Sequence, residues 1–236
     1  MSRPADPPPL EGFRRYAVYA LPEPGPLAAF GAGWLGWDIA AGRSVARPKI
    51  PGLPPFEVDP TARCRRYGFH ATIKPPFALT GTAEALQAEL AHLAENLGPV
   101  PAIPLELACL GRFVALVPTA PQPALQALAA EVVRGLDPHR APMTEAEAAR
   151  RTHPGLTLAQ RDNLARWGYP HVMETFRFHL TLSDRLPARA AARLREALAP
   201  ELAPLISSGF ALRSLVLCGE DEDGMFHLLR RVPLRG

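Results

Sequence analysis

The sequence has 236 residues, of which 47% are hydrophobic and 21% charged, and its formal net charge is +3. It contains no run of about 18 apolar residues that could span a bilayer, and it shows no signal-peptide pattern of a charged segment followed by an apolar one. Cys64, Cys109 and Cys218 lack disulfide or metal-type spacing, and the Arg and Lys residues form no dense tract of the nucleic-acid-binding type. We therefore expect a cytoplasmic protein without a membrane partner, a metal or a cofactor.

The first half of the chain alternates between strand-like and helix-like patterns. Thr is a favoured N-cap and Gly a favoured residue after a helix, so both mark helix ends here. In chain order we predict a strand over 15–21, a helix over about 27–41, a proline-rich irregular connection over 42–64, a strand-like segment YGFHATI over 67–73, a helix from Thr82 to Gly98, and a hairpin of strands 105–110 and 113–117.

From residue 113 onward the same order begins again. The segment FVALVP at 113–118 resembles AVYALP at 17–22. After it we predict a helix over 123–135, a long connection over about 138–173 with a helix near 158–167, a strand holding FHLTLS at 178–183, a helix over 188–198, and a closing hairpin of 210–217 and 226–232 across the turn GEDEDG.

This recurring order indicates an internal duplication, because self-similarity in a fixed order reports the architecture. We expect an α+β fold in a single bilobal domain over 1–236, with repeat one at about 13–111 and repeat two at about 112–236. Each lobe should hold an antiparallel sheet with flanking helices, and a pseudo-twofold axis should relate the lobes around a central cleft. The alternative is a chance similarity of two ordinary strand–helix–strand patterns.

The motif Phe-His-x-Thr occurs once in each half. Side chains alternate between the two faces of a strand, so His70, Thr72 and Lys74 should share one face of the first strand. The same alternation places Arg177, His179 and Thr181 on one face of the second. A lone polar strand face is usually just solvated, but solvation gives no reason for two such faces to match residue by residue.

Two facing imidazoles suit the chemistry of a phosphodiester. A neutral His takes a proton from the attacking group and a protonated one gives a proton to the leaving oxygen. We expect His70 and His179 to form this catalytic pair, with the order of base and acid left open. The substrate contacts should come from Thr72 and Thr181 at the non-bridging oxygens and from the cations Lys74 and Arg177.

The paired H-x-T motifs resemble those of the two-histidine phosphoesterase superfamily, which includes RNA ligase/cyclic phosphodiesterase-like enzymes. That resemblance implies a bilobal duplicated fold and metal-independent opening of 2′,3′-cyclic or related phosphodiesters. The longer strings RYGFHATIKPPF (66–77), ARWGYPHV (165–172) and FRFHLTLS (176–183) further resemble a branch associated with phosphonate-degradation operons. The second resemblance implies a role in phosphonate catabolism.

We therefore expect an enzyme that opens a cyclic phosphodiester of a small sugar phosphate or nucleotide. The alternatives are an RNA 2′,3′-cyclic end-processing enzyme, disfavoured by the absence of a dense basic stripe, and a non-catalytic module that binds a phosphometabolite or RNA. Tyr67 is expected to pack, and Arg140 is expected to be a solvated loop residue, with contact to a second anionic group as the alternative. The two long connections should wall the site and select the substrate; the oligomeric state is left open.

Overall fold

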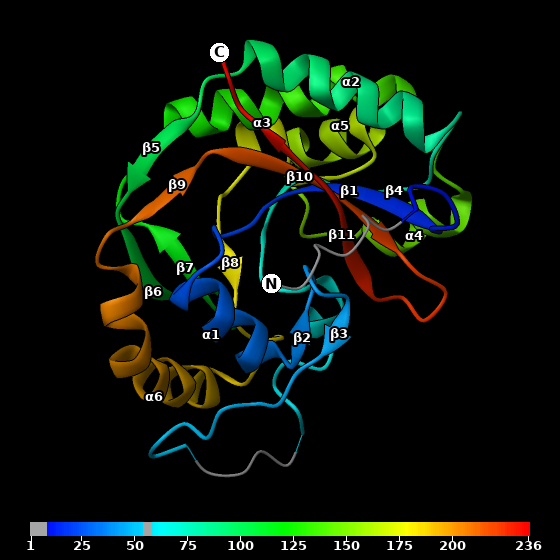
Figure 1. Ribbon diagram of the computed structural model, residues 1–236. Helices are drawn as coiled ribbons and strands as arrows, with labels where there is room; N and C mark the ends of the chain where they lie inside the picture. Colours follow the sequence, from blue (N-terminus) through cyan, green and yellow to red (C-terminus); the bar gives the residue numbers. More distant parts are fainter. Residues whose placement is uncertain (1–8, 54–57) are drawn as a thin grey trace.

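The computed structural model describes residues 9–53 and 58–236 (Figure 1). In chain order its elements are β1 Arg15–Ala20, α1 Pro26–Leu35, β2 Trp37–Asp38, β3 Arg43–Ser44, the 3₁₀ turn η1 Cys64–Tyr67, β4 Ala71–Phe77, α2 Ala83–Asn96, β5 Val100–Ile103, β6 Leu105–Leu110, β7 Phe113–Pro118, α3 Pro123–Gly135, η2 Asp137–His139, α4 Glu145–Arg151, α5 Leu158–Trp167, η3 Met173–Thr175, β8 Leu180–Thr181, α6 Ala188–Ile206, β9 Phe210–Leu212, β10 Ser214–Glu220 and β11 Phe226–Pro233. Helices pack on antiparallel sheets, so the predicted α+β class is confirmed.

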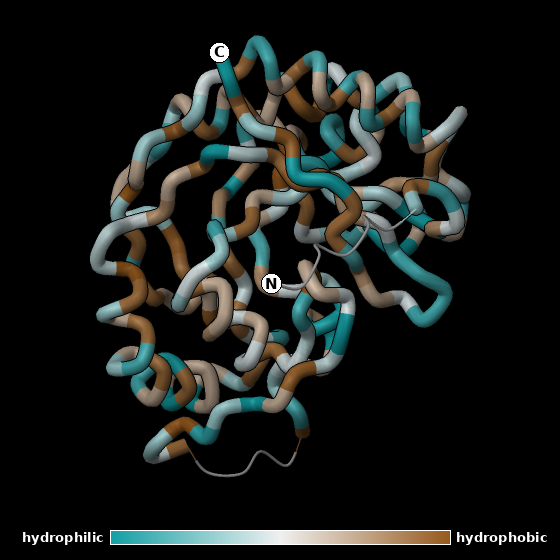
Figure 2. The backbone as a smooth tube through the Cα atoms, in the orientation of Figure 1, coloured by the Kyte–Doolittle hydropathy of each residue, from teal (hydrophilic) through white to brown (hydrophobic). Residues whose placement is uncertain are grey.

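The first lobe is built on a four-stranded antiparallel sheet with the order β11-β10-β1-β4. Helices α2 and α3 pack on one face of it, and Figure 1 shows them running across the top of the molecule. Apolar and polar residues alternate along both helices in Figure 2, and the apolar ones, such as Leu86 and Leu90, are fully buried. Burial of these apolar stripes is what holds the helices on the sheet.

The second lobe is built on a three-stranded antiparallel sheet with the order β6-β7-β8. Helix α6 packs on β6 and β7, and α1 packs on α6. Between the two lobes, β5 pairs with β9. These two strands follow α2 and α6 respectively, so they occupy equivalent places in the two halves of the chain.

Cross-strand pairing supports the duplication residue by residue. In the first lobe Tyr19 pairs with Thr72, and the neighbouring pair is Ala20 with Ala71. In the second lobe Ala115 pairs with Thr181, and the neighbouring pair is Leu116 with Leu180. Aligning AVYALP with FVALVP places Tyr19 on Ala115, so the two Thr residues occupy the same position in the two sheets.

The two lobes exchange helices. Helix α1 follows the first-lobe strand β1 but packs in the second lobe, where Trp34 Nε1 donates to the Leu182 carbonyl at 2.7 Å. Helix α3 follows the second-lobe strand β7 but packs against β4 of the first lobe. Each sheet therefore depends on both halves of the chain, while the repeat boundaries near residue 111 remain a prediction.

Two predicted helix ends differ from the structure. Helix α1 ends at Leu35 rather than near 41, because Gly36 adopts φ +80° and caps it in the left-handed conformation. Helix α6 continues to Ile206 through Pro200 and Pro204, although proline weakens a helix interior. Its buried Leu202 keeps the apolar face of that last part against the protein, and this burial outweighs the lost hydrogen bonds.

Candidate active site around two histidines

His70 and His179 occupy equivalent places, each directly before its strand. His70 immediately precedes β4 and His179 immediately precedes β8. These two strands lie in different sheets, yet they approach within 8 Å between Cα atoms. The fold therefore brings together two motifs that lie more than one hundred residues apart in the sequence.

The two imidazole rings are oriented by the same local bond. His70 Nδ1 lies 2.9 Å from the Gly68 carbonyl, and His179 Nδ1 lies 2.7 Å from the Arg177 carbonyl. A carbonyl can only accept, so each Nδ1 must carry the proton and donate it. In the neutral form each Nε2 is then unprotonated and can accept a proton from a bound molecule.

His70 is held on two further sides. Its ring stacks on Tyr19 with a centroid distance of 3.7 Å, and its Nε2 lies 3.1 Å from Thr72 Oγ1. Burial lowers the pKa of His70 to about 4, the bond to Gly68 opposes this, and the charge of His179 lowers the pKa further. The two imidazoles are therefore near enough to interact electrostatically.

His179 has a more open environment than His70. Phe113 lies beside it at a ring-centroid distance of 5.5 Å, in a tilted arrangement. Burial lowers the pKa of His179, and the bond to the Arg177 carbonyl works in the opposite direction. Thr181 follows on β8 two residues later, paired to Ala115 of β7.

The backbone before His70 requires glycine. Gly68 has φ +69°, and a Cβ there would lie 2.6 Å from the Ile39 side chain. The neighbouring Phe69 packs so closely on helix α1 that a Cβ at Gly31 would lie 2.0 Å from its ring. These two close approaches fix the turn that presents the Gly68 carbonyl to His70.

The structure corrects the predicted role of Lys74. A β-bulge places Thr72 opposite Tyr19 but Lys74 opposite Val18, so Thr72 and Lys74 lie on opposite faces of β4. The Lys74 side chain is 2% exposed, and its Nζ donates to the Val133 carbonyl at 3.0 Å and lies 3.6 Å from Asp137. Burial lowers its pKa to about 8, partly opposed by Asp137. Lys74 therefore anchors β4 to the end of α3 and does not face the histidines.

Arg177 is exposed and has no ion pair or side-chain hydrogen bond among the described residues. It borders a cavity of about 430 Å³ with Phe178, next to the end of β7. A larger cavity of about 590 Å³ lies between β6 and the end of α6, on a different part of the second lobe. Arg177 is thus an exposed cation two residues before His179, and its contact with the substrate stays a prediction.

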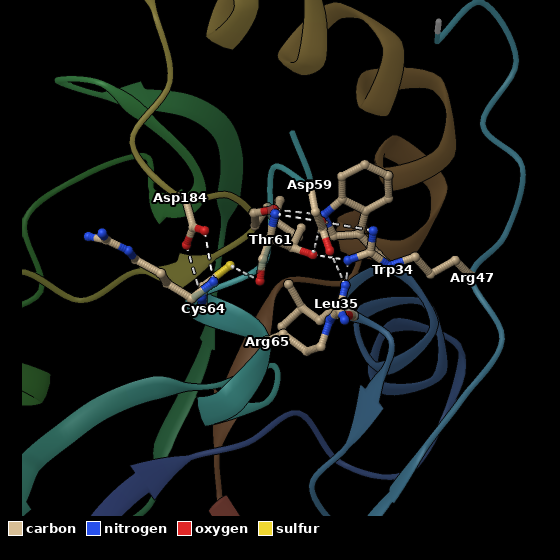
Figure 3. A network of polar contacts seen from close by, with 10 residues as sticks. Trp34, Leu35, Arg47, Asp59, Thr61, Cys64, Arg65 and Asp184 are labelled. Atoms are coloured by element: carbon tan, nitrogen blue, oxygen red, sulfur yellow. Dashed lines mark hydrogen bonds and ion pairs between the residues drawn. The ribbon is translucent and has the colours of Figure 1, made fainter. Parts of the chain in front are cut away.

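A polar network ties the first long connection to the second motif (Figure 3). The Asp184 carboxylate, at the end of FHLTLSD, accepts from the backbone N–H groups of Arg63 and Cys64 at 2.8 and 2.9 Å. Asp59 binds Arg47 at 2.9 Å and also pairs with Arg65. The turn that leads to His70 is thereby held on the chain segment that follows His179.

The second connection contributes residues that the sequence did not single out. Burial lowers the pKa of His171, and His153, His179 and Arg177 lower it further, so His171 lies near the second motif. Tyr169 packs on His171 at 5.8 Å between ring centroids. Both residues belong to the quoted string ARWGYPHV, but neither recurs in the first half, so duplication could not reveal them.

Tyr19 was also missed. It stacks on His70, and the structural alignment places Ala115 at the matching position of the second half. A comparison of AVYALP with FVALVP could have marked this difference. The expectation that Tyr67 packs is confirmed, because its ring lies 5.1 Å from that of Phe226. The expectation that Arg140 is solvated is wrong, because its guanidinium donates to Asp137 at 2.8 Å.

Within residues 9–53 and 58–236, no group of three or more His, Cys, Asp or Glu side chains is placed to hold a metal ion. In the same residues no helix has the length and apolar character needed to cross a membrane. Metal independence of the chemistry remains a prediction.

A family model described as "Protein of unknown function (DUF1045)" matches residues 72–227. The chain belongs to the DUF1045 family. The matched region of this DUF1045 protein begins two residues after His70 and contains the whole second motif. The first motif is therefore only partly inside it.

Two curated relatives share the name "Ribose 1,5-bisphosphate phosphokinase PhnN". The protein of Janthinobacterium sp. (strain Marseille) is 35% identical over 98% of this DUF1045 chain and 54% of its own length. The protein of Laribacter hongkongensis (strain HLHK9) is 38% identical over 78% of this chain and 45% of its own length. The chain thus spans about half the length of these relatives.

The alignments with two solved structures each cover 95% of this chain and 99% of the solved chain. "Crystal structure of E.coli LigT complexed with 3'-AMP" is 14% identical with a TM-score of 0.45, and "Crystal structure of phosphoesterase" is 13% identical with a TM-score of 0.47. Because both TM-scores lie below 0.5, the functional proposal rests on the residues of this chain itself.

Proposed function

We propose that this protein is a phosphodiesterase that opens a cyclic phosphodiester of a small sugar phosphate or nucleotide, without a metal, through His70 and His179. The observation that supports this most is the matched pair of Nδ1 bonds to the Gly68 and Arg177 carbonyls. Both bonds leave Nε2 for a bound molecule, and an anion-binding site alone has no need of two such oriented, titratable groups.

The two histidines divide the proton transfers. We assign the base to His70, because burial and stacking on Tyr19 hold it neutral, with a pKa of about 4. His70 Nε2 takes a proton from the attacking water, the water oxygen bonds to phosphorus, and the ring P–O bond breaks. Protonated His179 gives its proton to the leaving oxygen, so the product is a phosphomonoester and a hydroxyl.

The negative charge that builds on the non-bridging oxygens must be stabilised. Thr72 and Thr181 occupy matching positions two residues after the histidines and can donate their hydroxyl protons to these oxygens. Arg177 can approach the phosphate as a mobile cation. The Thr72 hydroxyl, now beside His70 Nε2, would turn toward the substrate on binding.

Two observations guide the choice of substrate class: the name of the curated relatives and the resemblance of the motif strings. The relatives' name refers to a sugar bisphosphate, so sugar phosphates are the first class to test. This chain contains no G-x-x-x-x-G-K-[ST] phosphate-binding loop, and its two lysines follow proline and isoleucine, so we do not carry their kinase activity over to it. A place in phosphonate catabolism is proposed from the resemblance of the motif strings.

The test is a turnover screen of the purified protein with and without EDTA. It includes nucleoside 2′,3′-cyclic phosphates, cyclic ribose phosphates and oligonucleotides with cyclic 2′,3′ ends. We expect hydrolysis of a small cyclic substrate that persists in EDTA. Exclusive action on oligonucleotides would favour RNA end processing, binding without turnover would favour a non-catalytic module, and metal-dependent turnover would contradict the proposed mechanism.

A further inference from the structure

Two arginines and two tyrosines have no task in the proposed chemistry, and one of the tyrosines lies beside His70. Arg15 and Tyr67 belong to the first lobe, and Arg151 and Tyr169 belong to the second connection. The Tyr67 ring centroid is 6.3 Å from that of His70. Tyr67 also packs on Phe226, over which the Arg15 guanidinium lies at 5.9 Å. We call Arg15, Tyr67, Arg151 and Tyr169 the Arg15–Arg151 cluster.

The two parts of the cluster interact electrostatically. The Arg151 guanidinium lies 5.8 Å from the centroid of the Tyr169 ring and donates to the Gly168 carbonyl. Burial lowers the pKa of Arg151; the charge of Glu147 opposes this, and repulsion from Arg15 and Arg150 adds to the lowering. Burial raises the pKa of Tyr169, which also responds to Arg151 and Tyr67. The second connection therefore completes a group that begins on the first sheet.

Of the two arginines in this cluster, only Arg15 forms an ion pair with a described residue, whereas Arg151 is attracted by Glu147 at longer range. Arg15 forms a bidentate pair with Glu220, with Nη2 to Oε1 at 2.6 Å. Among the described residues no carboxylate lies within ion-pair distance of Arg151. Two guanidinium groups held in a half-buried place repel each other, and a bound anion would relieve this repulsion.

The Tyr19 hydroxyl is an independent sign of a missing partner. The Tyr19 side chain is fully buried, and its phenol oxygen has no hydrogen-bond partner among the described residues. Burial raises the pKa of Tyr19, and Tyr67, Arg15 and Cys218 also shift it, so this oxygen lies close to the cluster. A neutral buried hydroxyl without a partner is rare, and an acceptor from a ligand or an ordered water would satisfy it.

We propose that the Arg15–Arg151 cluster is a second anion subsite, which binds a phosphomonoester carried by the same molecule whose cyclic phosphodiester lies between His70 and His179. The inference rests on the proposed function and narrows its substrate to molecules with two separate phosphate groups. Guanidinium groups suit a phosphomonoester because their fork of N–H groups matches its oxygens. The phenols of Tyr67 and Tyr169 add neutral donors on either side.

The test compares adenosine 2′,3′-cyclic phosphate with the same nucleotide carrying an additional 5′-phosphate. For the natural sequence we expect kcat/KM to be about 10- to 100-fold higher for the 5′-phosphorylated molecule. This range corresponds to the free energy that hydrogen bonds to a charged group contribute to binding. Arg151→Gln should reduce this ratio to near one, and Tyr19→Phe should reduce it several-fold. The matched control is Arg150→Gln, an exposed neighbour on α4 that loses the same charge and should keep the full ratio.

The outcomes separate this inference from the proposed function. If both nucleotides are hydrolysed equally well, or if Arg151→Gln and Arg150→Gln keep the same ratio, the subsite is wrong while the phosphodiesterase stands. If neither nucleotide is hydrolysed, calorimetric binding of adenosine 5′-monophosphate decides: equal affinity in the natural protein and Arg151→Gln overturns the subsite. Weaker binding by Arg151→Gln alone supports it. Circular dichroism checks that each variant is folded.

Discussion

The two H-x-T motifs share a backbone design but differ in what surrounds the imidazole. In both, Nδ1 donates to the carbonyl two residues earlier, and the Thr pairs with a matching position of the adjacent strand. In the first motif that position is Tyr19, which stacks on His70; in the second it is Ala115, and His179 stays more open. The two halves therefore share the orientation of the rings, whereas the surroundings of the rings differ; burial lowers the pKa of both histidines.

The strongest test removes each imidazole. His70→Ala and His179→Ala should each lower turnover by about 10² to 10⁴, because a general acid or base contributes that much. The double variant should lose less than the product of the single losses, since both act on one transition state. His92→Ala, on the exposed side of α2, is the control. A loss below about threefold for either site histidine would refute the pair.

The two threonines offer a smaller and more discriminating effect. Thr72→Ala and Thr181→Ala should each lower kcat by about 10- to 100-fold, because each removes a hydrogen bond to a charged oxygen. Serine at either position should restore most of the rate. Unequal losses measured by steady-state kinetics would show that only one motif binds the non-bridging oxygens.

The difference between the motifs should appear directly in their titration. In the free protein the His70 ring should titrate near pH 4, and His179 should titrate below the ordinary value of 6.5. Tyr19→Leu should raise the pKa of His70, because it opens the stacked face to water. Histidine ring signals followed by NMR over pH 3 to 8 measure this, and an unchanged His70 would contradict the role of Tyr19.

The same shift affects folding stability. Between pH 6.5 and about 4 the unfolded chain binds a proton at His70 that the folded protein does not, so the free energy of unfolding should fall as the pH falls through this window. Denaturant midpoints at pH 7 and pH 4.5 measure the loss. His70→Gln should make that loss smaller, and an equal loss in the variant would assign it to other groups.

The smallest effect on turnover is expected for Lys74. Lys74→Ala should lower the free energy of unfolding by about 2–4 kcal/mol, because it empties a buried site beside Val133 and Asp137. The rate per folded molecule should change by less than about threefold. A loss of turnover rate comparable to that of Thr72→Ala would indicate that Lys74 contacts the substrate phosphate.

The α+β class, the internal duplication and the histidine pair were all predicted from the sequence; the α+β class is confirmed, and the catalytic role of the two histidines stays a prediction. The repeated order of hydrophobic periods and the matched H-x-T spacing are local properties, and neither needs a contact between distant residues to be recognised. Helix ends marked by local signals were also predictable, as with α2, where Thr82 accepts from the Ala85 N–H as an N-cap.

Only the tertiary structure decided which residues surround the histidines. The bulge in β4 turned Lys74 away from Thr72, and strict alternation cannot foresee a bulge. The exchange of α1 and α3 between lobes and the network of Asp184 with the turn before His70 join segments far apart in the chain. Such contacts depend on how whole elements pack, and no local pattern in the sequence encodes them.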